Sequence, residues 1–153
     1  MKATLFAAAL AAAHPTAFAV PVKADWSDEV RGTYLAFATA QNARDLQKVR
    51  SLLLDSPQFL WVSDGRSVWG RDATIARMAT FQEAEVWRVE PALAGAVPVR
   101  VGEGTAYLHL PLRLVIGSDA KPDDLRFLVS VLCTRTPDGW RIAALFTTTD
   151  KRD

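Results

Sequence analysis

The chain has 153 residues, of which 50% are hydrophobic, and its 18 Lys and Arg residues nearly balance 17 Asp and Glu residues. This length suits one domain with a sizeable core, and the composition excludes a disordered chain. The formal net charge of +1 excludes the basic footprint of a nucleic-acid-binding protein, and the single cysteine excludes a disulfide framework or a thiolate-rich zinc site.

The N-terminal segment is typical of a secretory signal peptide. A lysine follows the first methionine, residues 3–13 form an apolar run, and small residues stand at Ala17 and Ala19. As a helix the run would extend roughly 16 Å, too short to cross a hydrocarbon core of about 30 Å. We therefore expect residues 1–19 to be removed, leaving 20–153 as one periplasmic or secreted domain without a membrane anchor. An N-terminal core helix is the alternative interpretation.

Two helices are predicted at the start of this domain. Ser27 is expected to cap the first, because acidic residues follow it in the first turn and favour the positive end of the helix dipole. Apolar residues at helical spacing continue the pattern to Gln41 and predict one face turned toward a core. Asp45 is expected to cap the second helix, which ends before Pro57.

The rest of the chain predicts a short strand, a third helix and then a sheet. The strand covers 59–63, residues 64–66 turn the chain, and the helix runs from Gly70 to about Phe81. Beyond it, residues alternate with a period of two in five segments, namely 86–89, 97–101, 105–116, 125–136 and 140–149. Pro-Asp-Gly at 137–139 is a strong hairpin signal. This order indicates an α+β fold, with three N-terminal helices packed over a curved antiparallel sheet.

Several motifs in this order resemble the nuclear-transport-factor-2-like superfamily, and specifically its SnoaL-like, ketosteroid-isomerase-like branch. They are TYLAFATAQNARDLQKVRSLL, FLWVSDG, GRDATIARM and RTPDGWRIAALFTTTD, and the resemblance covers roughly Trp26 to Asp150. It implies a cone-shaped fold in which the sheet curls around an apolar pocket closed by the helices. It also implies a homodimer formed through the outer face of the sheet. Because the superfamily includes several kinds of enzyme and also proteins without catalysis, the resemblance does not specify an activity.

The steroid-isomerase pattern of this superfamily has two counterparts in the chain. The resemblance places Tyr34 as the hydrogen-bond donor to a developing oxyanion and Asp64 as the general base. The family's second oxyanion donor, a protonated aspartate, has no counterpart, since the matching stretch LVSVLCT offers only Val131 or Leu132. A missing donor of this kind removes about 2.7–4 kcal/mol of transition-state stabilisation, which argues against the family's usual steroid isomerisation.

The two faces of the strand 105–116 differ sharply in polarity. One face carries Thr105, Tyr107, His109, Pro111, Arg113 and Val115. The other carries Ala106, Leu108, Leu110, Leu112, Leu114 and Ile116. The resemblance implies that the first, polar face lines the cone. Simple burial of apolar area allows the opposite arrangement, with the leucines inside and the polar residues in water. Both arrangements stay open.

If the polar face points inward, it joins Tyr34 and Asp64 in one acid–base site. Asp64 and His109 would then move a proton near neutral pH, while Arg113 would bind a carboxylate or enolate oxygen. Tyr107 and Phe146 would complete the substrate-binding wall. A plainer interpretation is that Asp64 is a turn residue and Tyr34 a core residue.

The sequence favours an exported small-molecule pocket protein, of which one form is a cofactor-independent lyase or isomerase acting next to a carbonyl. The alternative is a non-catalytic ligand-binding or dimerising accessory domain, and the sequence does not decide between them. No metal-ligand spacing, nucleophile elbow or phosphate loop is present, so we expect no metal and no cofactor. The expected partners are a small apolar or weakly acidic molecule and a second copy of the chain, without nucleic acid or membrane.

Overall fold

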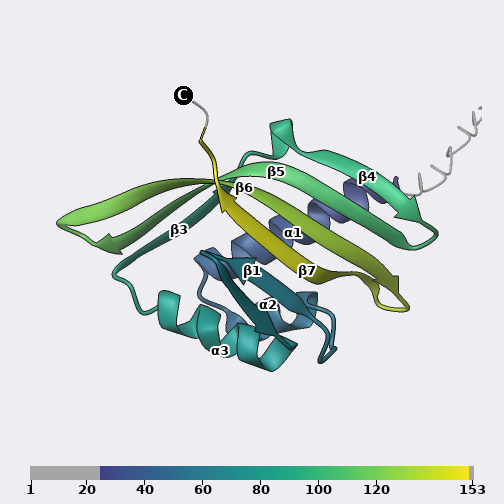
Figure 1. Ribbon diagram of the computed structural model, residues 1–153, viewed down its shortest axis with the longest axis horizontal. Helices are drawn as coiled ribbons and strands as arrows, with labels where there is room; N and C mark the ends of the chain where they lie inside the picture. The colour runs from purple at the N-terminus through teal and green to yellow at the C-terminus, as the bar shows by residue number, and fades with distance from the viewer. Residues whose placement is uncertain (1–24, 152–153) are drawn as a thin grey trace, which may run out of the picture.

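A computed structural model describes residues 25–151, so the predicted signal peptide, 1–19, lies outside the described part. The elements in chain order are α1 (Trp26–Asn42), α2 (Leu46–Leu52), β1 (Leu60–Ser63), β2 (Arg66–Trp69), α3 (Arg71–Phe81), β3 (Val86–Pro91), a 3-10 turn (Leu93–Gly95), β4 (Val97–Gly102), β5 (Thr105–Ser118), β6 (Lys121–Thr136) and β7 (Gly139–Thr149). Figure 1 shows the three α-helices gathered beneath a long, curved sheet, which confirms the predicted α+β class. None of the helices in residues 25–151 is long and apolar enough to span a membrane.

The sheet is open and mixed rather than purely antiparallel. Its strands lie in the order β2-β1-β7-β6-β5-β3, with β4 also paired to β5. The described ladders are antiparallel except that of β1 with β7, where Leu60 lies opposite Ala144. Hairpin signals predict pairing only between neighbouring segments. The parallel pair was not predicted because it joins two strands that are distant in the sequence.

The local predictions hold with small shifts. The Asp45 side chain accepts a hydrogen bond from the Lys48 backbone N–H at 2.9 Å, which confirms it as the cap of α2. The prediction that Ser27 caps α1 is wrong, because the helix already begins at Trp26 and the Ser27 hydroxyl donates to the Asp25 carboxylate at 2.8 Å. Ser27 therefore lies inside the first turn, and its hydroxyl group binds the acidic side chain before the helix instead of capping it.

The segment after β1 is a tight hairpin, which the sequence showed only as a turn. Asp64 and Gly65 have φ angles of 51° and 66°, and two consecutive positive values are the mark of a type I′ turn. This turn leads directly into β2, which the alternation analysis missed because the strand is short and mostly exposed. Asp64 is therefore a turn residue, as its plainer interpretation predicted.

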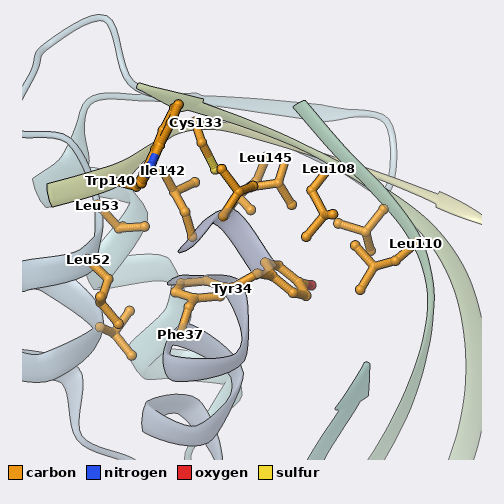
Figure 2. Close-up of a cluster of buried hydrophobic side chains, with 14 of the residues drawn as sticks. Tyr34, Phe37, Leu52, Leu53, Leu108, Leu110, Cys133, Trp140, Ile142 and Leu145 are labelled. Atoms are coloured by element: carbon orange, nitrogen blue, oxygen red, sulfur yellow. The ribbon is translucent and has the colours of Figure 1, made fainter. Parts of the chain in front are cut away.

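The core lies between α1 and the inner face of the sheet. Leu108 and Leu110 are fully buried in one cluster with the helix residues Tyr34 and Phe37, and Figure 2 shows the two leucines on the side of Tyr34. The leucine face of β5 thus points inward, and the expectation that the polar face lines the cone is wrong. The physical reason is that the leucine face has the larger apolar area. Burying this face stabilises the fold more than burying the polar face would. The same core encloses Cys133, where burial raises the pKa of the thiol to about 12.

The sheet edge at β3 is joined to the end of α1 by side chains. The Asn42 amide donates to the Val89 carbonyl at 2.8 Å and accepts from the Val89 N–H at 2.7 Å. The Trp87 indole N–H donates to the Gln41 carbonyl at 3.1 Å. These bonds satisfy backbone groups that an edge strand otherwise leaves unpaired, and they fix the distance between α1 and β3. They therefore define one end of the cavity described next.

Candidate functional site

A cavity of about 640 Å³ lies between the helices and the far half of the inner sheet face. Leu108 and Leu110 pack in the core. Toward the C-terminal end of β5, the same face of the strand lines the cavity. The sheet wall is formed by Leu112, Leu114, Ile116, Leu125, Phe127 and Val129. Aromatic side chains line much of the remainder, namely Phe37, Trp61, Phe81 and Trp87. The volume and the apolar lining are typical of a small-molecule site.

Tyr34 presents a hydrogen-bond donor to this cavity. Its side chain is only 2% exposed, yet its hydroxyl group forms no hydrogen bond with any residue in the described part of the chain. In Figure 2 the hydroxyl oxygen lies at the end of the ring that points away from Phe37. Burial raises the pKa of Tyr34 well above its ordinary range, so the hydroxyl stays protonated at physiological pH. A buried donor without a partner is suited to a ligand oxygen.

Asp64 lies at the mouth of the same cavity. It lines the cavity together with Ser63 and Gly65, and its side chain is exposed to solvent at the β1–β2 turn. No carboxylate–cation contact within 4.0 Å involves Asp64 among residues 25–151. The structure therefore brings Tyr34 and Asp64 to one cavity, with the tyrosine inside and the aspartate at the opening.

Arg77 is a cavity residue that sequence reasoning missed. It projects from the middle of α3, with its guanidinium 4.7 Å from the ring centre of Trp61 and 5.6 Å from that of Phe81. Its Nη1 atom is buried and has no hydrogen-bond partner. The available signal was its spacing, because Arg77 lies three residues after the buried Thr74 and four residues before Phe81, on one face of α3.

The polar residues of β5 lie outside the cavity, on the other side of the sheet. The His109 ring nitrogen Nδ1 is 3.0 Å from the Ser130 hydroxyl, across the β5–β6 ladder. Tyr107 is 38% exposed and Phe146, from β7, is 42% exposed on the same outer face. The acid–base site in which His109 joins Tyr34 and Asp64 is therefore not formed, and Tyr107 and Phe146 do not line the predicted substrate wall.

Arg113 also lies on the outer face, where it is neutralised by acidic neighbours. Its guanidinium donates to both carboxylate oxygens of Asp124 at 2.9 Å and to Glu90 at 2.8 Å. These hydrogen bonds hold the pKa of the Asp124 carboxyl below its usual range. An arginine paired in this way, outside the cavity, does not fill the substrate-binding role predicted for it. The cation inside the cavity is Arg77.

Metal chemistry has no evident donor set in residues 25–151, where no group of three or more His, Cys, Asp or Glu side chains is placed to hold an ion. The lining hydroxyl groups belong to Tyr34, Ser63 and the consecutive Thr147, Thr148 and Thr149 of β7, and one amide belongs to Gln41. Within residues 25–151 the cavity therefore offers several neutral hydroxyl and amide groups, one carboxylate and one cation along an apolar wall.

Comparison with known proteins agrees with this architecture. The sequence model of the SnoaL-like domain matches residues 30–145. Among solved structures, an NTF2-like superfamily protein from Salmonella enterica has a TM-score of 0.75 at 12% identity, covering 83% of this chain and 92% of that one. A proposed dehydratase of the NTF2-like family from Streptomyces avermitilis has a TM-score of 0.73 at 18% identity, covering 82% and 96%. A protein with a cystatin-like fold from Caulobacter vibrioides has a TM-score of 0.70 at 17% identity, covering 82% and 90%. A search of curated proteins finds no match.

Proposed function

Because the chain belongs to the SnoaL-like domain family, we propose that it binds a small, largely apolar carbonyl compound in its cavity and moves a proton next to the carbonyl. The observation that carries this proposal is the unpartnered hydroxyl of Tyr34 within a cavity that also contains the carboxylate of Asp64. A protonated donor fixed in a largely apolar cavity interacts more strongly with a developing negative charge than the same donor does in bulk water. The likeness to a proposed dehydratase from Streptomyces avermitilis is consistent with this chemistry.

The proposed step is the abstraction of a proton by Asp64, which forms an enolate. The Asp64 carboxylate takes a proton from the carbon next to the carbonyl, and the electrons of the broken C–H bond move onto the carbonyl oxygen. The resulting enolate accepts a hydrogen bond from Tyr34. In a β,γ-unsaturated carbonyl compound the enolate is conjugated with the C=C bond, and return of the proton to the γ carbon gives an isomer. In a β-hydroxy compound, departure of the hydroxyl group, protonated to water, gives a dehydrated product. His109 has no part in this step because its side chain lies on the other side of the sheet.

Hydrogen–deuterium exchange at a ketone tests this proposal without knowledge of the natural substrate. With 2-acetylnaphthalene in D₂O, we expect the protein to accelerate exchange of the methyl protons, followed by NMR. Asp64→Asn is expected to lower the enzyme-dependent rate by at least about 100-fold, because the general base is lost. Tyr34→Phe is expected to lower it by about 100-fold or more, because the enolate loses its donor.

The matched control is Asp138→Asn, which makes the same change at an exposed hairpin turn outside the cavity lining. This control should exchange the ketone like the wild type. Equal rates for wild type and Asp64→Asn would contradict the catalytic role. The exposure of Asp64 favours one alternative, a binding protein without catalysis. Binding of the ketone with exchange no faster than in buffer would establish that alternative instead.

We also propose that two copies associate through the outer sheet face. Phe146 lies at the middle of this face, between Val62 on β1 and Ser130 on β6, and Tyr107 and Val97 are exposed on the same side. Sheets that pack face to face bury apolar side chains of this kind, and a second copy offers the same surface. Export is part of the proposal and rests on the sequence of residues 1–19 alone.

A further inference from the structure

We propose that the natural ligand carries a single carboxylate group and that Arg77 binds it. This inference rests on the proposed function, because it names the class of molecule that occupies the same cavity. Arg77 lines the cavity, and its buried Nη1 has no hydrogen-bond acceptor. No carboxylate within residues 25–151 lies within 4.0 Å of its guanidinium nitrogens. Arg77 is half-buried, and leaving its buried Nη1 without an acceptor is costly, so the position favours an anion supplied from outside the chain.

Other arginines with a buried nitrogen atom do have partners. Arg71 also has a buried, unbonded Nε, but its Nη2 atom is 2.8 Å from an Asp55 carboxylate oxygen. Arg31 has a similar Nε, but its Nη2 atom donates to the Ala96 carbonyl at 3.0 Å. In Arg77 no guanidinium nitrogen has an acceptor within the described part of the chain. The missing partner is thus particular to the cavity and is not a general property of arginines in this fold.

The aromatic neighbours of Arg77 fix its orientation. The rings of Trp61 and Phe81 form an edge-to-face pair, with centres 6.1 Å apart and planes at 72°, and the guanidinium lies against both. Because the two ring planes are steeply inclined, the guanidinium cannot lie flat on both rings, and the N–H groups that do not point at a ring stay available to a ligand. A carboxylate has two oxygens at the spacing of this planar fork, so it is the anion that matches. The aromatic contacts therefore position the Arg77 guanidinium before the ligand binds.

The charges around the cavity favour a singly charged ligand with an apolar body. Among the described lining residues, Asp64 and Arg77 are the charged ones. The charge of a carboxylate is balanced by the one arginine, whereas a doubly charged phosphate would keep an unbalanced charge and be repelled by Asp64 about twice as strongly as a carboxylate is. The sheet wall of leucine, isoleucine and phenylalanine side chains suits a ring or a branched hydrocarbon. The expected ligand is therefore an apolar monocarboxylate.

Calorimetric binding of three naphthalene derivatives to the wild type tests this inference. The probes are 2-naphthoate, the neutral 2-acetylnaphthalene and 2-naphthyl phosphate, which share one ring system and differ in the polar group. We expect naphthoate to bind at least about tenfold more tightly than the ketone, and the phosphate to bind less tightly than naphthoate. If the ketone binds and naphthoate binds no more tightly, this inference alone fails. If neither binds, the proposed function fails as well. Tighter binding of the phosphate would overturn the choice of a monocarboxylate.

Variants of Arg77 localise the effect. Arg77→Met is expected to weaken naphthoate binding by about 10- to 100-fold while changing ketone affinity by less than about threefold. Arg126→Met makes the same charge change at an exposed outer residue and should leave both affinities unchanged. Arg77→Lys keeps the charge but loses the planar fork, so an intermediate loss is expected even if Arg77→Met does not fold. Unchanged naphthoate affinity in Arg77→Met or in Arg77→Lys would overturn the proposal.

Discussion

Replacement of Leu110 by alanine is expected to lower the free energy of unfolding by about 2–5 kcal/mol, the range found for buried leucines. Leu110 is fully buried between the sheet and α1, so truncation removes apolar contacts and leaves a cavity. The same replacement at the neighbouring His109 is expected to cost only about 1 kcal/mol, because it removes one hydrogen bond to Ser130 on the outer face. Urea denaturation followed by circular dichroism measures both values.

This pair of variants tests which face of β5 points inward. The two positions are adjacent in the sequence and both variants end in alanine, so differences in strand propensity largely cancel. A larger loss for His109→Ala than for Leu110→Ala would mean that the polar face is buried. It would also restore the arrangement in which His109 lines the cavity.

Replacement of Phe146 by aspartate is expected to raise the dimer dissociation constant by about 100-fold or more. Phe146 is 42% exposed and lies in the middle of the outer sheet face, the position where interface residues contribute most. An aspartate there would place an unpaired charge between two apolar surfaces. In sedimentation velocity at micromolar concentration we expect the wild type as a dimer and Phe146→Asp as a monomer.

The control for this experiment is Leu35→Asp, which introduces the same charge at a leucine 46% exposed on α1, away from the sheet. This variant should remain a dimer. A monomeric wild type, or a dimeric Phe146→Asp, would show that the outer face does not join two copies. The inward-facing cavity does not depend on that result, because its lining comes from the opposite face of the sheet.

Local sequence signals predicted most of the elements, because each of them depends on neighbouring residues. Asp45 caps α2, and the apolar spacing from Val30 to Gln41 gives the buried face of α1. The parallel pairing of β1 with β7 was beyond such reasoning, since it depends on which distant segments come together. The order of the helices and of the longer strands followed from the same local signals, whereas the short strand β2 was missed.

The candidate site was predicted only in part, for two physical reasons. Alternation along β5 separates two faces but does not say which one turns inward, and that choice placed His109 and Arg113 in the wrong surroundings. Arg77 was missed because a single arginine on a helix resembles a solvated residue. Its place in the cavity is recognised only from its contacts with Trp61 and Phe81, and the contact with Trp61 depends on the tertiary fold. Tyr34 and Asp64, which the resemblance marked directly, both line the cavity, and their catalytic roles stay a prediction.

The central claim is that the cavity beneath the leucine face binds a small apolar carbonyl or carboxylate compound. Methyl-labelled NMR spectra recorded during addition of 2-naphthoate test it most directly. The account predicts shift changes at the methyl groups of Leu112, Leu114 and Ile116, which line the cavity, and none at Val97, which is 53% exposed on the outer side. Shift changes confined to Val97 and its neighbours, or none at all at millimolar ligand, would contradict it.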